Sequence, residues 1–214
     1  MSNPRSGQYG MYYGSLYEES EPLTQAHMET NSEYIYKALT AAGWTKQSIA
    51  AILGNMQAES TINPGRWQSD LIGNTSGGYS LVQWTPATKY TEWCTGAGYS
   101  DPSEMDAAIA RILYEVENEI QWIPTGAHDM TFWEFTRNTA TPSELAKAFL
   151  LNYERPADQS EAVQAYRGSL ANSWYSYLTG TNPGTPGTPT KPRKKKKYNF
   201  ILFGNKPWRN RQWH

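Results

Sequence analysis

One glutamate, Glu59, lies where a carboxyl group can work as a general acid. It closes residues 45–60, a run in which apolar residues recur at helical spacing: Ile49, Ile52, Leu53 and Met56. In a helix Glu59 falls about 20° from Ile52, at the edge of this apolar stripe. Apolar surroundings and the negative end of a helix dipole both favour the protonated carboxyl, which proton donation near neutral pH requires. The alternative is a glutamate that reaches into solvent at a frayed helix end.

The segment after Glu59 is polar, glycine-rich and aromatic. It includes residues 63–65, 67–68, 74–79 and 83–84, and this composition predicts a loop with one or two short strands beside the Glu59 helix. Amide and hydroxyl groups hydrogen-bond sugar hydroxyls, and flat aromatic rings stack on sugar faces. A carboxylic acid beside such a loop therefore indicates cleavage of a glycosidic bond.

Four more side chains are candidates for binding the substrate: Tyr79, Gln83, Trp84 and Tyr153. The first three follow two glycines, and the last falls on the apolar face of a predicted helix. Packing in the core is the competing interpretation for these residues, since aromatic rings after glycines often fill a core edge. We interpret the neighbouring Glu154 and Arg155 as a structural ion pair.

The stereochemistry of cleavage depends on a second carboxylate. Asp70 is the only acid between Glu59 and Gln83. A retaining enzyme needs its two carboxyl groups roughly 5–5.5 Å apart, and an inverting enzyme roughly 6.5–9.5 Å apart. Asp70 either fills this role or starts a turn, and we prefer the turn. Without a second acid, water held by Thr75, Ser76 or Gln83 would give inversion, and attack by the substrate's own 6-hydroxyl would give a 1,6-anhydro product.

Three blocks of the sequence resemble a known family: residues 52–65, 77–85 and 152–156. Together they resemble the tail-associated (tail-tip or tail-knob) lysozymes of short-tailed phages of Gram-positive hosts, over about residues 30–178. More distantly, Glu59-Ser60 and residues 80–83 are similar to the Glu-Ser and Gly-Leu-Met-Gln signatures of lytic transglycosylases and goose-type lysozymes. Ser80 stands where that signature has Gly. Asn152 and Tyr153 stand where related transglycosylases carry a Tyr over the catalytic acid.

The resemblance implies a phage-tail peptidoglycan hydrolase of the muramidase type, with Glu59 as general acid and no cofactor. Its target would be the β-1,4 bond between N-acetylmuramic acid and N-acetylglucosamine, cleaved at the tail tip of the virion to open the host cell wall during entry. A lytic transglycosylase is one alternative. A non-catalytic wall-binding or structural tail protein is another, although a pure binder has no use for an acid at the edge of an apolar stripe.

Several other classes of protein are not expected from the composition. A single Cys94 allows no internal disulfide and no multi-cysteine metal site. The three histidines, His27, His128 and His214, lack metal-binding spacing, so we expect no metal. The first residues lack the basic and apolar regions of a secretion signal. The sequence also contains no run of about 20 apolar residues, so we expect no membrane span.

The scaffold that would position these residues is predicted to be mainly α (α+β), with six or seven helices and the strand-bearing loop. Apolar spacing and capping motifs predict helices over residues 30–42, 45–60, 89–94 and 102–122, then from 131, over 141–153, and from 158. The helix over 102–122 is expected to be the longest. In the last helix the expected inward residues are Val163, Tyr166, Leu170, Trp174 and Tyr177.

We expect four segments along the chain: an extended N-terminal arm (1–29), a lysozyme-like catalytic domain (30–179), a Gly/Pro/Thr linker (180–192) and a basic, aromatic anchoring tail (193–214). The overall charge of −1 hides a split, because residues 1–180 carry 10 Lys and Arg but all 20 Asp and Glu. The other 9 basic residues follow position 180. The charge of the tail therefore serves something other than the catalytic fold.

The basic tail has three interpretations. It is a solvated solubility tail, a nucleic-acid-binding segment, or a docking element. Lys and Arg clusters neutralise phosphates, but no base-reading element accompanies them, so we expect no nucleic acid. The apolar residues 198–203 would be a costly exposed patch. We therefore expect the tail to dock on a partner, and the resemblance implies a tail-tip or tail-knob protein.

Overall fold

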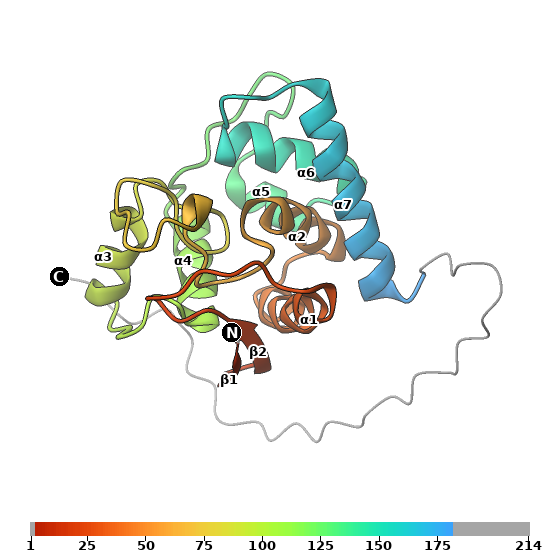
Figure 1. Cartoon of the computed structure of the whole chain (residues 1–214). Coiled ribbons are helices and arrows are strands. Elements are labelled where there is room, and N and C mark those ends of the chain that lie inside the picture. The colour runs from red at the N-terminus through yellow and green to blue at the C-terminus, as the bar shows by residue number, and fades with distance from the viewer. Residues whose placement is uncertain (1–2, 182–214) are drawn as a thin grey trace. The chain divides into compact units, whose positions relative to one another are not determined.

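The computed structural model describes residues 3–181 of the 214-residue chain (Figure 1). Two strands form a hairpin, β1 (Asn3–Gly7) and β2 (Gly10–Gly14). The α-helices of the described residues are α1 (Gln25–Ala41), α2 (Lys46–Ser60), α3 (Thr88–Gly96), α4 (Met105–Glu117), α5 (Phe132–Arg137), α6 (Pro142–Phe149) and α7 (Glu161–Thr179). A short 3-10 turn, η1 (Gln68–Asp70), and a π-helical turn, η2 (Leu150–Glu154), complete them. The predicted mainly helical class is confirmed. Most of the predicted linker and all of the predicted tail lie outside the described residues.

Helix α2 is the central element of the fold. It contacts α1, α5, α6 and α7, and Figure 1 shows it between α1 and the group formed by α5, α6 and α7. The predicted stripe of apolar residues is buried. Gly54 allows a close approach to α7, because a Cβ atom at this position would lie 2.6 Å from the backbone nitrogen of Ala171. No helix within residues 3–181 has the length and apolar character needed to cross a membrane.

The ends of α2 are fixed by local chemistry. Thr45 is the N-cap, and its hydroxyl accepts a hydrogen bond from the Ser48 amide at 3.2 Å. At the other end Thr61 adopts a left-handed conformation (φ 55°), which stops the helix. Both limits match the predicted helix over residues 45–60. Glu59 consequently lies in the last turn of α2.

The N-terminal residues differ from the predicted extended arm. They form the β1–β2 hairpin, and Asn31 of α1 binds it: its side chain accepts from the Tyr13 amide and donates to the Tyr13 carbonyl, both at 2.7 Å. Helix α1 begins at Gln25 after the N-cap Thr24, so the predicted start of this helix at residue 30 is wrong. The Thr30 hydroxyl instead donates to a carbonyl one turn earlier, as Ser and Thr inside a helix commonly do.

Two expectations about helices are also corrected. The longest helix of the described residues is α7, with 19 residues, whereas α4 has 13. The chain leaves α4 after Glu117 and turns through left-handed residues at Glu119 and Gln121. On α7 the expected inward Tyr166 is 55% exposed. The buried residues of this helix are Arg167, Gly168, Ala171 and Trp174.

Candidate active site

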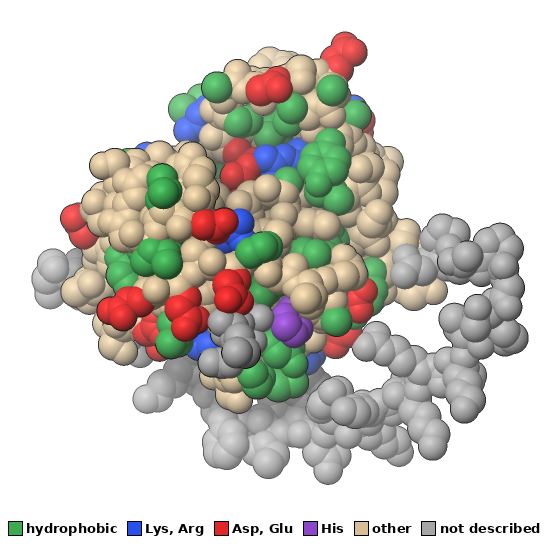
Figure 2. Space-filling model, in the orientation of Figure 1, with side chains coloured by type: hydrophobic (Ala, Val, Ile, Leu, Met, Phe, Trp, Pro, Cys, Tyr) green, Lys and Arg blue, Asp and Glu red, His purple; other side chains and the backbone are tan. Residues whose placement is uncertain are grey.

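A pocket of about 460 Å³ opens beside the C-terminal end of α2. We call it the Glu59 pocket. Figure 2 shows the surface hollowed between the side of the molecule that carries α3 and the side formed by α6 and α7, with acidic and basic side chains next to each other there. Its lining is Glu59, residues 66–69, residues 82–85, Lys89, Gln121, Tyr153, Glu154, Pro156 and Ala157.

Glu59 lies at the floor of this pocket and is held by an arginine from α7. Its side chain is 22% exposed, and one carboxylate oxygen accepts a hydrogen bond from Nη2 of Arg167. Arg167 is almost buried, and its Nη1 donates to the carbonyl of Asn55 at 2.7 Å. The guanidinium thus contacts a backbone acceptor and the carboxylate on one helix, α2. This double contact fixes the orientation of Glu59.

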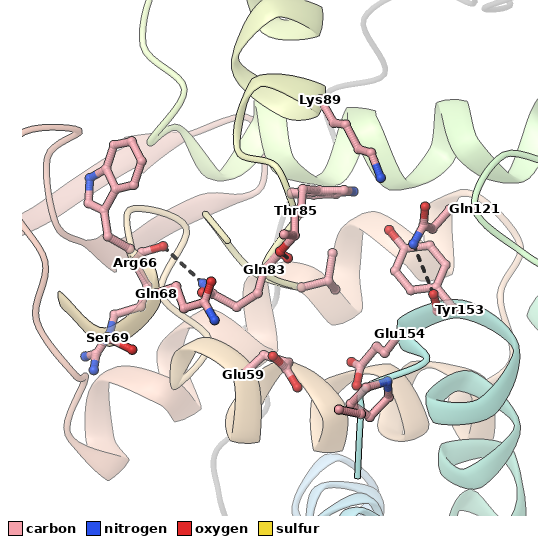
Figure 3. Close-up of a pocket in the computed structure, with 15 residues that line it drawn as sticks. Glu59, Arg66, Gln68, Ser69, Gln83, Thr85, Lys89, Gln121, Tyr153 and Glu154 are labelled. Carbon is pink, nitrogen blue, oxygen red and sulfur yellow. Dashed lines mark hydrogen bonds between the residues drawn. The ribbon is translucent and has the colours of Figure 1, made fainter. Parts of the chain in front are cut away.

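A second carboxyl group, Glu154, lies next to Glu59. It comes from the π-helical turn η2, and its side chain is only 5% exposed. Nη2 of Arg167 lies 3.7 Å from Oε2 of Glu154. Figure 3 shows the carboxyl groups of Glu59 and Glu154 facing each other at the floor of the pocket. The pocket therefore contains a pair of carboxyl groups, and one guanidinium contacts both.

The two carboxyl groups of Glu59 and Glu154 share one guanidinium, that of Arg167. Burial, and then the charge of Glu59, raise the pKa of Glu154 well above its usual value, and Arg167 offsets only part of this. Neither oxygen of Glu154 accepts a hydrogen bond from a donor within residues 3–181. Two neighbouring carboxylates rarely ionise together in a buried site. The raised pKa favours the protonated form of Glu154, and this side chain lies within hydrogen-bonding reach of Glu59.

The expected Glu154–Arg155 ion pair is wrong. The Arg155 Nη1 atom donates to two backbone carbonyls, that of Gln121 at 2.6 Å and that of Asn152 at 2.5 Å. Arg155 ends η2 in a left-handed conformation (φ 48°), and adjacent residues at a helix end point in different directions. Glu154 therefore faces Arg167 instead.

Gln83 lines the pocket, and its role in substrate binding stays a prediction. Its Nε2 donates to the carbonyl of Arg66 at 3.1 Å and to that of Ser80 at 2.9 Å; Figure 3 shows the first of these bonds above Glu59. Ser80 has a φ of 72°, a conformation that favours the Gly found at this position in the related signature. The tight turn is thus kept with Ser80, and Gln83 joins it to the loop at Arg66.

The structure corrects the expectation that Tyr79 binds the substrate. Tyr79 is fully buried and is not part of the pocket lining. Its ring packs against Trp67 at 4.4 Å and against Tyr17 at 5.3 Å between centroids. The ring therefore fills the core edge under the loop instead of facing the pocket.

Trp84 and Tyr153 line the pocket but are nearly buried, with 4% and 2% of their surfaces exposed. Their polar atoms point away from the pocket to one buried acid: Trp84 Nε1 and the Tyr153 hydroxyl donate to Glu115 at 3.0 and 2.5 Å. Arg111 pairs with the same carboxylate at 2.9 Å. The two rings thus form a fixed apolar part of the pocket wall.

Asp70 does not reach the pocket. It is half-exposed and pairs with Arg66 at 3.0 Å, while the Ser20 hydroxyl donates to it at 2.9 Å. Its φ of 58° places it in a turn, which is the role we preferred. Thr75 and Ser76 are not part of the lining either. Within residues 3–181, the acids that line the pocket are Glu59 and Glu154.

Comparison with known proteins assigns the family. Residues 30–178 match the family model for phage tail lysozymes. The chain is also 48% identical over 165 residues to Morphogenesis protein 1 of Bacillus phage B103, a match that covers 77% of this chain and 44% of that protein. The chain thus spans less than half the length of this curated relative. With most of its length matched by the family model, the chain belongs to the phage tail lysozyme family, which supports a peptidoglycan-degrading activity.

Proposed function

We propose that this phage tail lysozyme hydrolyses the β-1,4 bond between N-acetylmuramic acid and N-acetylglucosamine in peptidoglycan, with Glu59 as general acid. The observation that carries the proposal is the position of Glu59: it is partly exposed at the floor of the pocket and held there by Arg167. Of the two acids that line the pocket, Glu59 is the more exposed. General acid catalysis requires contact with the leaving oxygen, which favours Glu59 over Glu154.

The walls of the Glu59 pocket suit a glycan strand. Amide side chains of Gln68, Gln83 and Gln121 line it, and the rings of Trp84 and Tyr153 form part of its surface. Amides hydrogen-bond sugar hydroxyls, and the small exposed parts of the two rings give a pyranose ring an apolar contact. This composition supports a saccharide ligand, and it gives Gln83 and the two rings a role in substrate binding.

The nucleophile decides between two reactions at this pocket. Glu154 lies beside Glu59 and is nearly buried, so it is poorly placed to act on the opposite face of a sugar ring. Attack by water near Gln83 gives hydrolysis with inversion. Attack by the 6-hydroxyl of the muramic acid residue gives a lytic transglycosylase, and the lack of a facing carboxylate among the described residues favours this as the second candidate.

Mass spectrometry of digested peptidoglycan tests the proposed reaction. Reducing N-acetylmuramic acid ends are the expected product. Ends that are lighter by one water, which are 1,6-anhydro ends, would identify a transglycosylase. Unchanged glycan strands, with the protein folded and bound to the wall, would contradict both and identify a wall-binding protein.

The proposed setting is the tail of a virion, where the enzyme opens the host cell wall during infection. Membership of the phage tail lysozyme family and the likeness to a phage morphogenesis protein support this setting. We assign the tail, residues 193–214, a docking role on a tail-tip or tail-knob protein. Its basic charge and its apolar stretch over residues 198–203 support docking.

A further inference from the structure

Glu154 is a buried acid for which a simple general-acid mechanism has no use. Burying a carboxyl group without a hydrogen-bond donor is unfavourable, and within residues 3–181 neither oxygen of Glu154 receives a hydrogen bond. Its only close cation in this region is Arg167, at 3.7 Å, and that cation already contacts Glu59. A purely structural site would be better served by an apolar or amide side chain. The arrangement therefore calls for a role for this second carboxyl group.

The charged groups that act on Glu154 come from two elements. Glu59 reaches it from α2 and Arg167 from α7. One positive and two negative groups are neutralised by one proton, and the carboxyl that is more buried holds it more tightly. Arg167 is itself fixed, because its Nη1 donates to the Asn55 carbonyl. The same guanidinium is thus able to stabilise a negative charge on either carboxyl group without moving far.

We propose that Glu154 is a positioning residue that stores the catalytic proton and passes it to Glu59. This inference rests on the proposed function of Glu59 as general acid. At rest Glu154 is protonated and donates a hydrogen bond to the Glu59 carboxylate, which pairs with Arg167. When a glycan strand displaces water from the pocket, the Glu59 carboxylate loses solvation. The proton then moves from Glu154 to Glu59, and Arg167 stabilises the new charge on Glu154.

The remaining steps return the proton to the pair. Glu59 donates its proton to the glycosidic oxygen as the bond from that oxygen to C1 breaks, and a water molecule forms the new bond at C1. The water gives up one proton, which returns to the carboxyl pair. One water is consumed for each bond that is broken, and the pair with Arg167 ends each cycle with the one proton it began with.

The test compares the pH dependence of peptidoglycan cleavage by the full chain and by Glu154→Gln. Glutamine keeps the shape of the side chain and an N–H donor for Glu59, but it cannot pass on a proton. We expect cleavage by Glu154→Gln to fall at least tenfold near pH 7 and to recover partly in acid. The alkaline limb of its pH–rate profile should shift to lower pH, because Glu59 must then hold its own proton beside Arg167. A loss of folded protein alone would scale the profile without shifting it.

Two further variants make the result decisive. Glu117→Gln removes an exposed carboxyl of α4 and should leave both rate and pH profile unchanged. Glu59→Gln tests the proposed function separately. If the Glu59→Gln protein stays active, the proposed function fails. If it is inactive but the pH profile of Glu154→Gln superimposes on that of the wild type, only the role of Glu154 is overturned.

A spectroscopic titration avoids dependence on the folding of Glu154→Gln. In the full wild-type chain with 13C-labelled glutamate carboxyls, one signal should titrate at high pH and move to lower pH in Glu59→Gln, because Arg167 then faces a single carboxylate. If every glutamate signal other than that of residue 59 titrates identically in the wild type and in Glu59→Gln, the proposal is also overturned.

Discussion

Arg167 of α7 forms an ion pair with Glu59 of α2 across 108 positions of the chain. Two small residues allow it: Gly54 brings the backbone of α2 against α7, and Gly168 brings α7 against Ser143, where a Cβ atom would lie 2.3 Å from the serine hydroxyl. The packing of three helices thus places the guanidinium at the end of α2. The orientation of the proposed catalytic acid is therefore a property of the whole helical core.

Replacing Arg167 should destabilise the fold in a pH-dependent way. Arg167→Met leaves the nearly buried Glu154 and the partly exposed Glu59 without their cation, and breaking a buried ion pair costs about 3–5 kcal/mol. We expect a loss of about 3 kcal/mol in the free energy of unfolding near pH 7, and a smaller loss near pH 5, where the carboxyl groups take up protons. Urea unfolding at the two pH values measures this difference.

The control for Arg167→Met is Lys147→Met, which removes a cation from the surface pair with Glu144. Such pairs contribute about 0–1 kcal/mol, so this change should be small at both pH values. An equal loss at pH 5 and pH 7 for Arg167→Met would show that the carboxyl groups play no part in it.

The raised pKa of Glu154 has a consequence for stability that Glu154→Gln isolates. The folded state binds this proton more tightly than the unfolded state, where the usual pKa is 4.5. The contribution to stability is therefore complete below pH 4.5 and is lost as pH rises toward the folded pKa, by at most about 1.4 kcal/mol per pH unit. Glutamine has no such proton, so the variant should gain stability relative to the wild type as pH rises. A difference that stays constant from pH 4.5 to about pH 8 in denaturant unfolding contradicts the raised pKa.

Gln83→Ala should reduce turnover or substrate binding at least tenfold while the domain stays folded. The side chain joins the turn at Ser80 to the loop at Arg66 by two hydrogen bonds and faces the pocket. Rates on purified peptidoglycan, corrected for the folded fraction, test this.

Tyr79→Phe is the matched control for Gln83→Ala. The Tyr79 hydroxyl is buried without a partner in the described part of the chain. Its removal should therefore leave activity unchanged and the free energy of unfolding equal or about 1 kcal/mol higher. Similar losses of activity in Gln83→Ala and Tyr79→Phe would mean that Gln83 has only a packing role.

Local sequence patterns were enough to predict α2 and the position of Glu59. The apolar stripe sets the helix face, Thr45 sets the start, and the glycine-rich segment that follows sets the loop. The β1–β2 hairpin was missed because it depends on distant partners: Arg5, for example, pairs with Asp101 at 2.6 Å. A segment rich in Gly, Ser and Tyr shows no period by which its strands are recognised.

The two side chains next to Glu59, Arg167 and Glu154, were missed for a related reason. Apolar periodicity placed Tyr166 inward on α7, whereas burial of Arg167 depends on a carboxylate on another helix. A signal was present, since Gly168 and Ala171 mark a face that packs closely against a neighbour. Glu154 was assigned to Arg155 because they are adjacent, but the π-helical turn directs it to the pocket. Spacing rules for regular helices do not anticipate such a turn.

The proposed docking tail should be separable from catalysis. A chain truncated after Gly180 keeps every residue that lines the Glu59 pocket, so it should retain full activity on purified cell wall. In infected cells the truncated protein should be absent from purified phage particles, which immunoblotting of the particles measures. Normal stoichiometry in the particles would remove the docking role. Reduced activity of the purified, folded truncated enzyme would instead make the tail a wall-binding element.

The rate at which Glu59→Gln releases reducing ends from purified peptidoglycan tests the central claim most directly. Glutamine is nearly isosteric but cannot donate the proton, and general acid catalysis contributes about 10²–10⁴-fold. With circular dichroism showing the same helical content as the wild type, the rate should fall at least about 100-fold near neutral pH. A folded Glu59→Gln protein that cleaves the wall at a tenth of the wild-type rate or faster would contradict the assignment of Glu59 as the general acid.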